Sequence, residues 1–145
     1  MMFTGNTPSN PIKNTQLLKI YTTELSNGTW TKPVEFIHNK ANSNNAHPAI
    51  NSNTSIMVFA SDGLGGNMDL YYCVKDKFNN WKQAVRLKNN VNSGGNEVFP
   101  SFINDSTLVF SSDGLSSSGK GLDLNQTQIR KGKWSDPVIL PAPFN

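Results

Sequence analysis

Three tryptophans stand in the same local setting and divide the chain into repeats. Trp30, Trp81 and Trp134 are separated by 51 and 53 residues, and a valine follows each of them four positions later. A short strand-like segment ends nine or ten residues before each tryptophan, as in Asp69-Leu70-Tyr71. A regular period of this length is typical of repeat architectures. The chain is therefore expected to fold as successive copies of one unit.

A second landmark recurs upstream of the last two tryptophans. Residues 56–63, which end in Ser-Asp-Gly, match residues 107–114 at an offset of 51, and residues 1–6 form a degenerate copy. His47-Pro48 precedes the first full copy, and Phe99-Pro100 precedes the second. The landmarks keep their order in both full copies, which supports a true internal repeat.

Each full copy reads as four short strands. The first strand is expected after the His47-Pro48 or Phe99-Pro100 step, and the second ends at Ser-Asp-Gly. The third strand begins at Asp69 or Asp123, and the fourth covers residues 84–87 or 137–140. The chain holds 20 Asn, 15 Ser and 11 Gly, which favour turns over helix interiors. The prediction is an all-β fold of four-stranded β-propeller blades.

The repeats set the expected domain boundaries. Residues 1–37 form a partial blade without its first strand, residues 46–88 and 97–140 form two full blades, and residues 141–145 lead into a further blade. This gives eleven strands. Closed propellers have four to eight blades, so the segment is expected to be an arc of a larger propeller. The alternative is self-association, in which two chains complete one ring.

The segments 92–100, 108–114 and 121–124 carry a family likeness. The chain resembles the WD40-like, TolB-type propeller repeat proteins of the Bacteroidetes envelope, which often precede OmpA-like domains. The resemblance implies a periplasmic or outer-membrane location, envelope protein partners, and in some members a role in type IX secretion. It also implies glycan or peptidoglycan contact through the parent protein. Asn125 departs from the pattern, because an aromatic residue is expected there.

Repetition separates structural from functional residues. A structural residue is needed once per blade, whereas a catalytic residue is needed once. The recurring residues are therefore assigned to structure, as turn acceptors or as packing groups between blades. They are Trp30, Trp81, Trp134, Asp62, Asp113, Asp69, Asp123, Phe59 and Phe110.

Three residues are candidates for binding: Glu97, Asn67 and Lys120. Glu97 does not recur and precedes a first strand, which in a propeller faces the central channel; the structural alternative is a cap on the turn at Gly94-Gly95. Asn67 and Lys120 lie in the loops 63–68 and 115–121, which together with the basic turns 75–77 and 130–133 form the expected binding surface.

No metal or cofactor is expected. Asp62, Asn67 and Asp69 offer oxygens for calcium, but their spacing fits no defined calcium loop. The two histidines, His38 and His47, lack metal-ligand spacing.

Charge and hydropathy exclude further classes. The net charge is only +3 and the basic residues are dispersed, so no nucleic-acid partner is expected. No run approaches the roughly 18 apolar residues of a membrane span, and no signal peptide is visible. The favoured function is a non-enzymatic binding or scaffold module. The alternative is a glycan-active propeller enzyme, a glycosidase or lyase, with Glu97 as an acid in the central channel.

Overall fold

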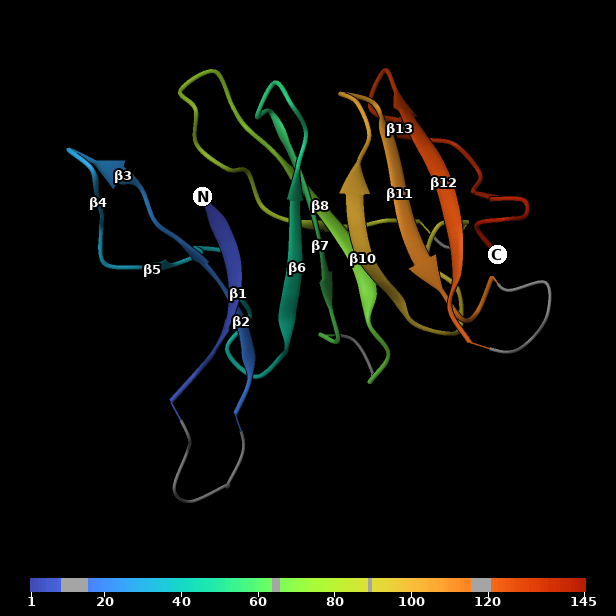
Figure 1. Ribbon diagram of the computed structural model, residues 1–145, viewed down its shortest axis with the longest axis horizontal. Helices are drawn as coiled ribbons and strands as arrows, with labels where there is room; N and C mark the ends of the chain where they lie inside the picture. Colours follow the sequence, from blue (N-terminus) through green and yellow to red (C-terminus); the bar gives the residue numbers. More distant parts are fainter. Residues whose placement is uncertain (9–15, 64–65, 89, 116–120) are drawn as a thin grey trace.

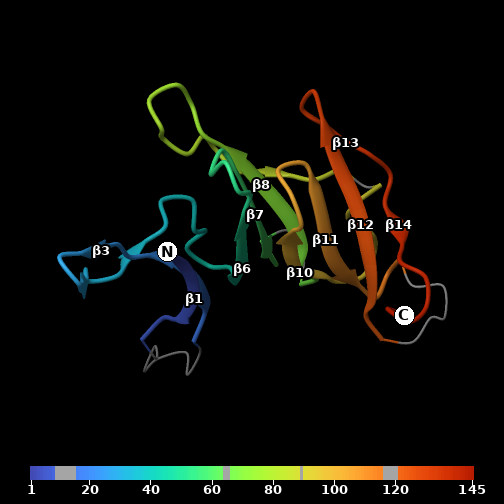
Figure 2. The ribbon, with the colours of Figure 1, turned by 45° about the horizontal axis from the view of Figure 1, so that its top comes forward.

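The computed structural model describes residues 1–8, 16–63, 66–88, 90–115 and 121–145, and this part of the chain contains fourteen β-strands and no helix (Figure 1). The predicted all-β class is confirmed. No helix that could cross a membrane occurs among these residues. The strands form three main antiparallel sheets, which lie side by side in chain order in both ribbon views (Figures 1 and 2).

The three sheets share one strand order. Sheet one contains β1 (Met2–Asn6), β2 (Leu18–Thr22) and β5 (Val34–Glu35). Sheet two contains β6 (Asn45–Ile50), β7 (Ile56–Ser61), β8 (Asp69–Val74) and β9 (Val85–Arg86). Sheet three contains β10 (Glu97–Phe102), β11 (Thr107–Ser112), β12 (Asp123–Arg130) and β14 (Val138–Ile139). Sheet one thus matches the last three strands of the other two.

Three short strands were not predicted. They are β3 (Leu25–Ser26), β4 (Thr29–Trp30) and β13 (Lys133–Trp134). They form two-residue hairpins, whose turns Asn27-Gly28 and Lys131-Gly132 have positive φ at both positions. This conformation matches the twist of paired strands, and Asn-Gly is its strongest sequence signal. Trp30 and Trp134 are therefore the last residues of the second strand of a hairpin. In sheet two, Trp81 pairs with Lys75 in a single bridge.

The first strands begin earlier than predicted and contain the residue–proline step. The β6–β7 ladder shifts register between Ala46 and Ala49, and the β10–β11 ladder shifts between Val98 and Ser101. A bulge leaves residues without a ladder partner, which accommodates a proline that has no N–H. His47 and Phe99 occupy these bulges with φ of 55° and 51°, and their ring centroids lie 4.2 Å apart.

Sheet two is covered on both faces. Met57 and Phe59 of β7 pack with Ile20 and Phe36 of sheet one. The alternate residues Val58 and Ala60 pack toward sheet three, in a core with Leu70, Leu87, Val91, Val98, Leu108 and Phe110. Burial on both faces explains why β7 is a continuous apolar run and not an alternating one.

Three asparagines close the three sheets in the same way. The side-chain amides of Asn39, Asn92 and Asn145 each bond the main-chain N–H and C=O of one residue, which lies on β2, β8 and β12 respectively. The clamped residues are Ile20, Leu70 and Leu124, with distances of 2.7–3.1 Å. These asparagine clamps recur every 53 residues. Residues 141–145, predicted to lead into another blade, thus end on a clamp equivalent to the one that precedes β10.

Candidate functional site

The recurring carboxylates Asp62 and Asp113 brace the turn before each first strand. Asp62 accepts the main-chain N–H of Asn44 at 2.7 Å and its side-chain amide at 2.6 Å. Asp113 accepts the same two groups from Asn96, at 2.6 and 2.9 Å. These bonds lower the pKa of Asp113. The two aspartates therefore make equivalent links between the second strand and the turn that leads into its sheet.

The other recurring pair does not share one set of contacts. Asp69 and Asp123 begin the third strands of sheets two and three, at equivalent places in the ladder. The Asp69 carboxylate receives two bonds from Arg86, at 2.7 and 2.8 Å, across the sheet. Ile139 occupies the place of Arg86 in sheet three, because it pairs with Asn125 as Arg86 pairs with Tyr71. The ion pair between Asp69 and Arg86 is therefore not repeated at Asp123 with the residue in the place of Arg86.

Four of the five recurring aromatics pack between sheets. Phe59 and Phe110 are buried in the two cores, and Trp81 and Trp134 are partly buried against the preceding sheet. Trp30, on β4 of the separate β3–β4 hairpin, is 52% exposed and belongs to neither core, so it does not have the packing role predicted for it.

Glu97 is fully buried between sheets two and three. Oε1 accepts the hydroxyls of Ser93 and Ser112, and Oε2 accepts the main-chain N–H of Ser93 at 3.0 Å. Burial raises the pKa of Glu97, and the bonds from the serines oppose this. The carboxyl group thus joins the turn at Ser93 to β11.

The three residues whose spacing argued against a calcium loop have other partners. Asp62 binds Asn44, Asp69 binds Arg86, and the Asn67 amide donates to the Gly94 carbonyl at 2.7 Å. Within the residues that the structure describes, no group of three or more His, Cys, Asp or Glu could hold a metal ion. Lys120 lies outside the described residues.

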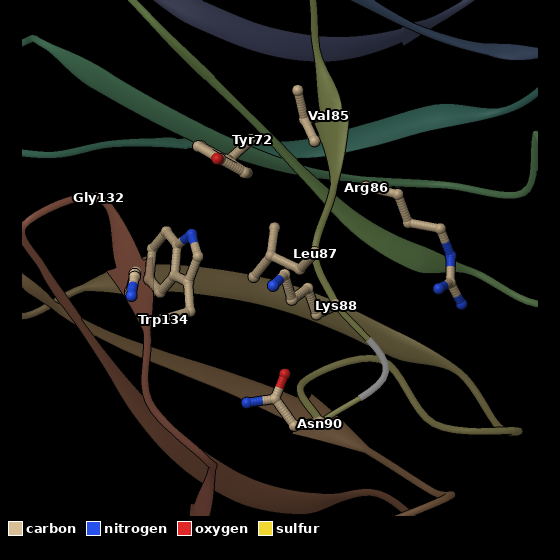
Figure 3. Close-up of a pocket in the computed structure, with 9 residues that line it drawn as sticks. Tyr72, Val85, Arg86, Leu87, Lys88, Asn90, Gly132 and Trp134 are labelled. Atoms are coloured by element: carbon tan, nitrogen blue, oxygen red, sulfur yellow. The ribbon is translucent and has the colours of Figure 1, made fainter.

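One concave site of the structure was not predicted from the sequence. A pocket of about 390 Å³ opens between β9 of sheet two and the β12–β13 hairpin of sheet three (Figure 3). We call it the junction pocket. It is lined by Tyr72, Val85, Arg86, Leu87, Lys88, Asn90, Gly132, Lys133 and Trp134. Its volume falls within the range of small-molecule sites, about 300–1,000 Å³.

The junction pocket combines aromatic walls with positive charge. Trp134 and Tyr72 meet edge to face, with ring centroids 5.9 Å apart. The indole Nε1 of Trp134 is buried and has no hydrogen-bond partner. In Figure 3 the Lys88 side chain extends toward Trp134, whereas the Arg86 side chain points away from it. The Arg86 guanidinium binds the Asp69 carboxylate. The pocket therefore offers an aromatic surface and a cation.

The corresponding junction between sheets one and two carries different residues. Glu35 and Val34 pair with β2 as Arg86 and Val85 pair with β8, so Phe36 and Ile37 correspond to Leu87 and Lys88. Phe36 and Leu87 are both buried in the cores, and Phe36 has the larger side chain. A comparison of the fourth strands in the sequence could have indicated this difference, because their residues differ in charge and size between the repeats.

No protein-family model matches the chain, and no curated protein matches it either. The assignment of a site therefore depends on its geometry and chemistry.

Proposed function

We propose that the chain is a non-enzymatic binding and scaffold module made of propeller-type blades, and that it binds its ligand in the junction pocket. The observation that carries this proposal is the chemistry of the pocket. Its cationic and small residues do not recur at the equivalent junction, so the repeat does not need them for packing. A pocket whose residues are not needed for packing, and which has polar groups in its lining, is the usual form of a ligand site.

The arrangement of the sheets supports the propeller assignment. Sheets two and three are four-stranded antiparallel meanders, and sheet one repeats their last three strands. The first strand β6 lies against β1 on one side and β10 on the other. Successive blades of a propeller are related in this way, with their first strands gathered around one axis.

The surroundings of Glu97 favour binding over catalysis. An acid in a channel must reach a substrate, but Glu97 is fully buried and both of its oxygens accept bonds from serines. The glycan-active enzyme stays the alternative prediction. Its test is activity of the intact protein on polysaccharides that Glu97→Gln abolishes.

We further propose the bacterial envelope as the place of binding, with a protein or a cell-wall component as the partner. The test is co-sedimentation of the purified chain with isolated envelopes of a Bacteroidetes bacterium. The double variant Lys88→Gln/Lys133→Gln removes two exposed cations of the pocket. The control Lys32→Gln/Lys82→Gln removes the same charge from exposed positions outside it.

The wild-type chain and the control are expected to sediment with the envelopes, and the pocket variant is expected to stay in the supernatant. Sedimentation of the pocket variant to the wild-type level, or no sedimentation of the wild-type chain, contradicts the proposal.

A further inference from the structure

We infer that the junction pocket binds the ring of an acidic sugar, with a carboxylate on the ligand meeting Lys88 and Lys133. This inference depends on the proposed function, because it names the ligand class of the same pocket. Two features of the lining support it: the aromatic surface and the balance of charge.

The aromatic surface suits a sugar ring. Trp134 and Tyr72 stand nearly perpendicular, with an interplanar angle of 74°, and so form a corner. One face of a pyranose ring carries only C–H groups and packs against a flat aromatic surface, while its hydroxyls remain free to form hydrogen bonds. Tryptophan and tyrosine serve such ligands well because each combines a large apolar ring with a polar group.

The charge of the lining selects an anion. Among the nine residues that line the pocket, three are basic and none is acidic. Arg86 is bound to Asp69, and the nearby Asp136 accepts the side-chain amide of Asn90 at 2.7 Å. The ammonium groups of Lys88 and Lys133 are the cations that remain to meet a ligand carboxylate. A neutral sugar would gain nothing from them.

The same charges are missing at the equivalent junction of sheets one and two. At the junction of sheets one and two, Glu35 replaces Arg86 and Ile37 replaces Lys88. His38 there bonds the Trp81 carbonyl at 3.0 Å, so that junction is tied by protein groups. The basic character of the junction pocket is therefore a local property of this one site.

The test is isothermal titration of the whole chain with three probes: trigalacturonic acid, neutral maltotriose and the acidic tripeptide Glu-Glu-Glu. We expect trigalacturonic acid to bind, maltotriose to bind at least about tenfold more weakly, and the peptide, which lacks a sugar ring, to bind at least about tenfold more weakly. Added salt should weaken uronate binding, since it screens exposed charges.

Variants locate the binding to the pocket. Lys88→Gln/Lys133→Gln should weaken the binding of trigalacturonic acid at least about tenfold, and Trp134→Phe, which reduces the aromatic surface of the pocket, about fivefold. Lys32→Gln/Lys82→Gln and Trp30→Phe are the matched controls and should bind as the wild type does. The lysine variant changes exposed side chains, so it gives a result even where Trp134→Phe lowers stability.

Several results overturn the inference: no binding of trigalacturonic acid, equal binding of maltotriose or of the peptide, or unchanged binding in the lysine variant. Loss of envelope binding in that variant without any uronate binding would remove the acidic sugar but keep the binding function. Failure of both experiments would remove both proposals.

Discussion

Lys19 of sheet one and Asp69 of sheet two occupy the same position in their ladders with opposite charges. Lys19 lies opposite Gly5 in β1, and Asp69 lies opposite Ser61 in β7. The Lys19 ammonium donates to the main-chain carbonyls of Lys40, Ala41 and Ser43, whereas Asp69 accepts bonds from Arg86. The charged side chain at this position of the repeat therefore has different partners in the two sheets. In sheet one it binds main-chain carbonyls of the segment that connects to sheet two, and in sheet two it binds an arginine of the neighbouring strand.

Lys19→Met should lower the free energy of unfolding by about 2–4 kcal/mol, because Lys19 is 3% exposed and its ammonium group donates to three main-chain carbonyl groups that would lose this charged donor. Urea unfolding measures the change. Lys32→Met, at an exposed position, should stay within about 0.5 kcal/mol of the wild type. Equal effects of the two substitutions would contradict the role given to Lys19.

The asparagine clamps should differ in strength according to burial. Asn92 is 1% exposed and bonds Leu70 and the Leu87 carbonyl, so Asn92→Ala should cost about 2–4 kcal/mol of unfolding free energy. Asn145 makes equivalent bonds to Leu124 and Leu140 at an exposed position. Asn145→Ala should therefore cost less than about 1 kcal/mol.

Thermal or urea unfolding of both clamp variants gives the comparison, with Asn42→Ala as an exposed control. A similar cost for Asn92→Ala and Asn145→Ala would show that burial does not set the strength of the clamp.

Glu97 should make stability depend on pH. Burial raises its pKa in the folded chain above the ordinary value of 4.5, so the folded state holds the proton more tightly than the unfolded state. This contribution is complete below pH 4.5 and is lost as the pH rises through the raised pKa. Glu97→Gln stays neutral, so its unfolding free energy should fall less across that range.

The measurement is a series of urea unfolding curves that starts below pH 4.5. Asp113 gives the opposite control: its pKa is lowered by Asn96, so its contribution is present above 3.8 and is lost as the pH falls through the lowered pKa. Asp113→Asn should therefore flatten the acid side of the curve, and Glu97→Gln the side above pH 4.5. The same profile for both variants would refute the assignment.

At the bulge position Phe99, a glycine variant should be more stable than an alanine variant, which is the reverse of the usual order inside a strand. Alanine normally exceeds glycine by about 0.5–1 kcal/mol inside a strand, but positive φ penalises alanine by about 1–2 kcal/mol. Because Phe99 has φ of 51°, Phe99→Gly should be more stable than Phe99→Ala by about 1 kcal/mol. Ser101 lies in the same strand without a positive φ, so there alanine should exceed glycine. Chemical denaturation of the four variants decides between the two orders.

Much of the fold could be predicted because its signals recur. The tryptophan spacing and the Ser-Asp-Gly steps located sheets two and three, since residues that repeat at a fixed offset occupy equivalent places. The Asn27-Gly28 pair is a sequence signal for the hairpin found there, although the hairpin was not predicted. The asparagine clamps were harder to see, because three meaningful asparagines are hidden among 20 in a chain rich in polar turns.

The candidate site was less predictable for a physical reason. The junction pocket lies between β9, with the residues that follow it, and the β12–β13 hairpin of the next sheet. Its lining residues belong to no local motif and come together where two sheets meet. Glu97 was singled out because it does not recur, but its burial and its bonds to Ser93 and Ser112 come from tertiary packing.

The clamp spacing also defines how this chain changes length without losing its fold. A cut after Asn39 and another after Asn92 enclose 53 residues, which contain sheet two and one clamp. Excision of that block would bring Leu108 and Phe110 to the places of Met57 and Phe59, against Ile20 and Phe36. Duplication of it would insert one more sheet of the same kind. The clamps thus mark the natural joints for recombination, and whole-repeat gain or loss is the change that this architecture tolerates best.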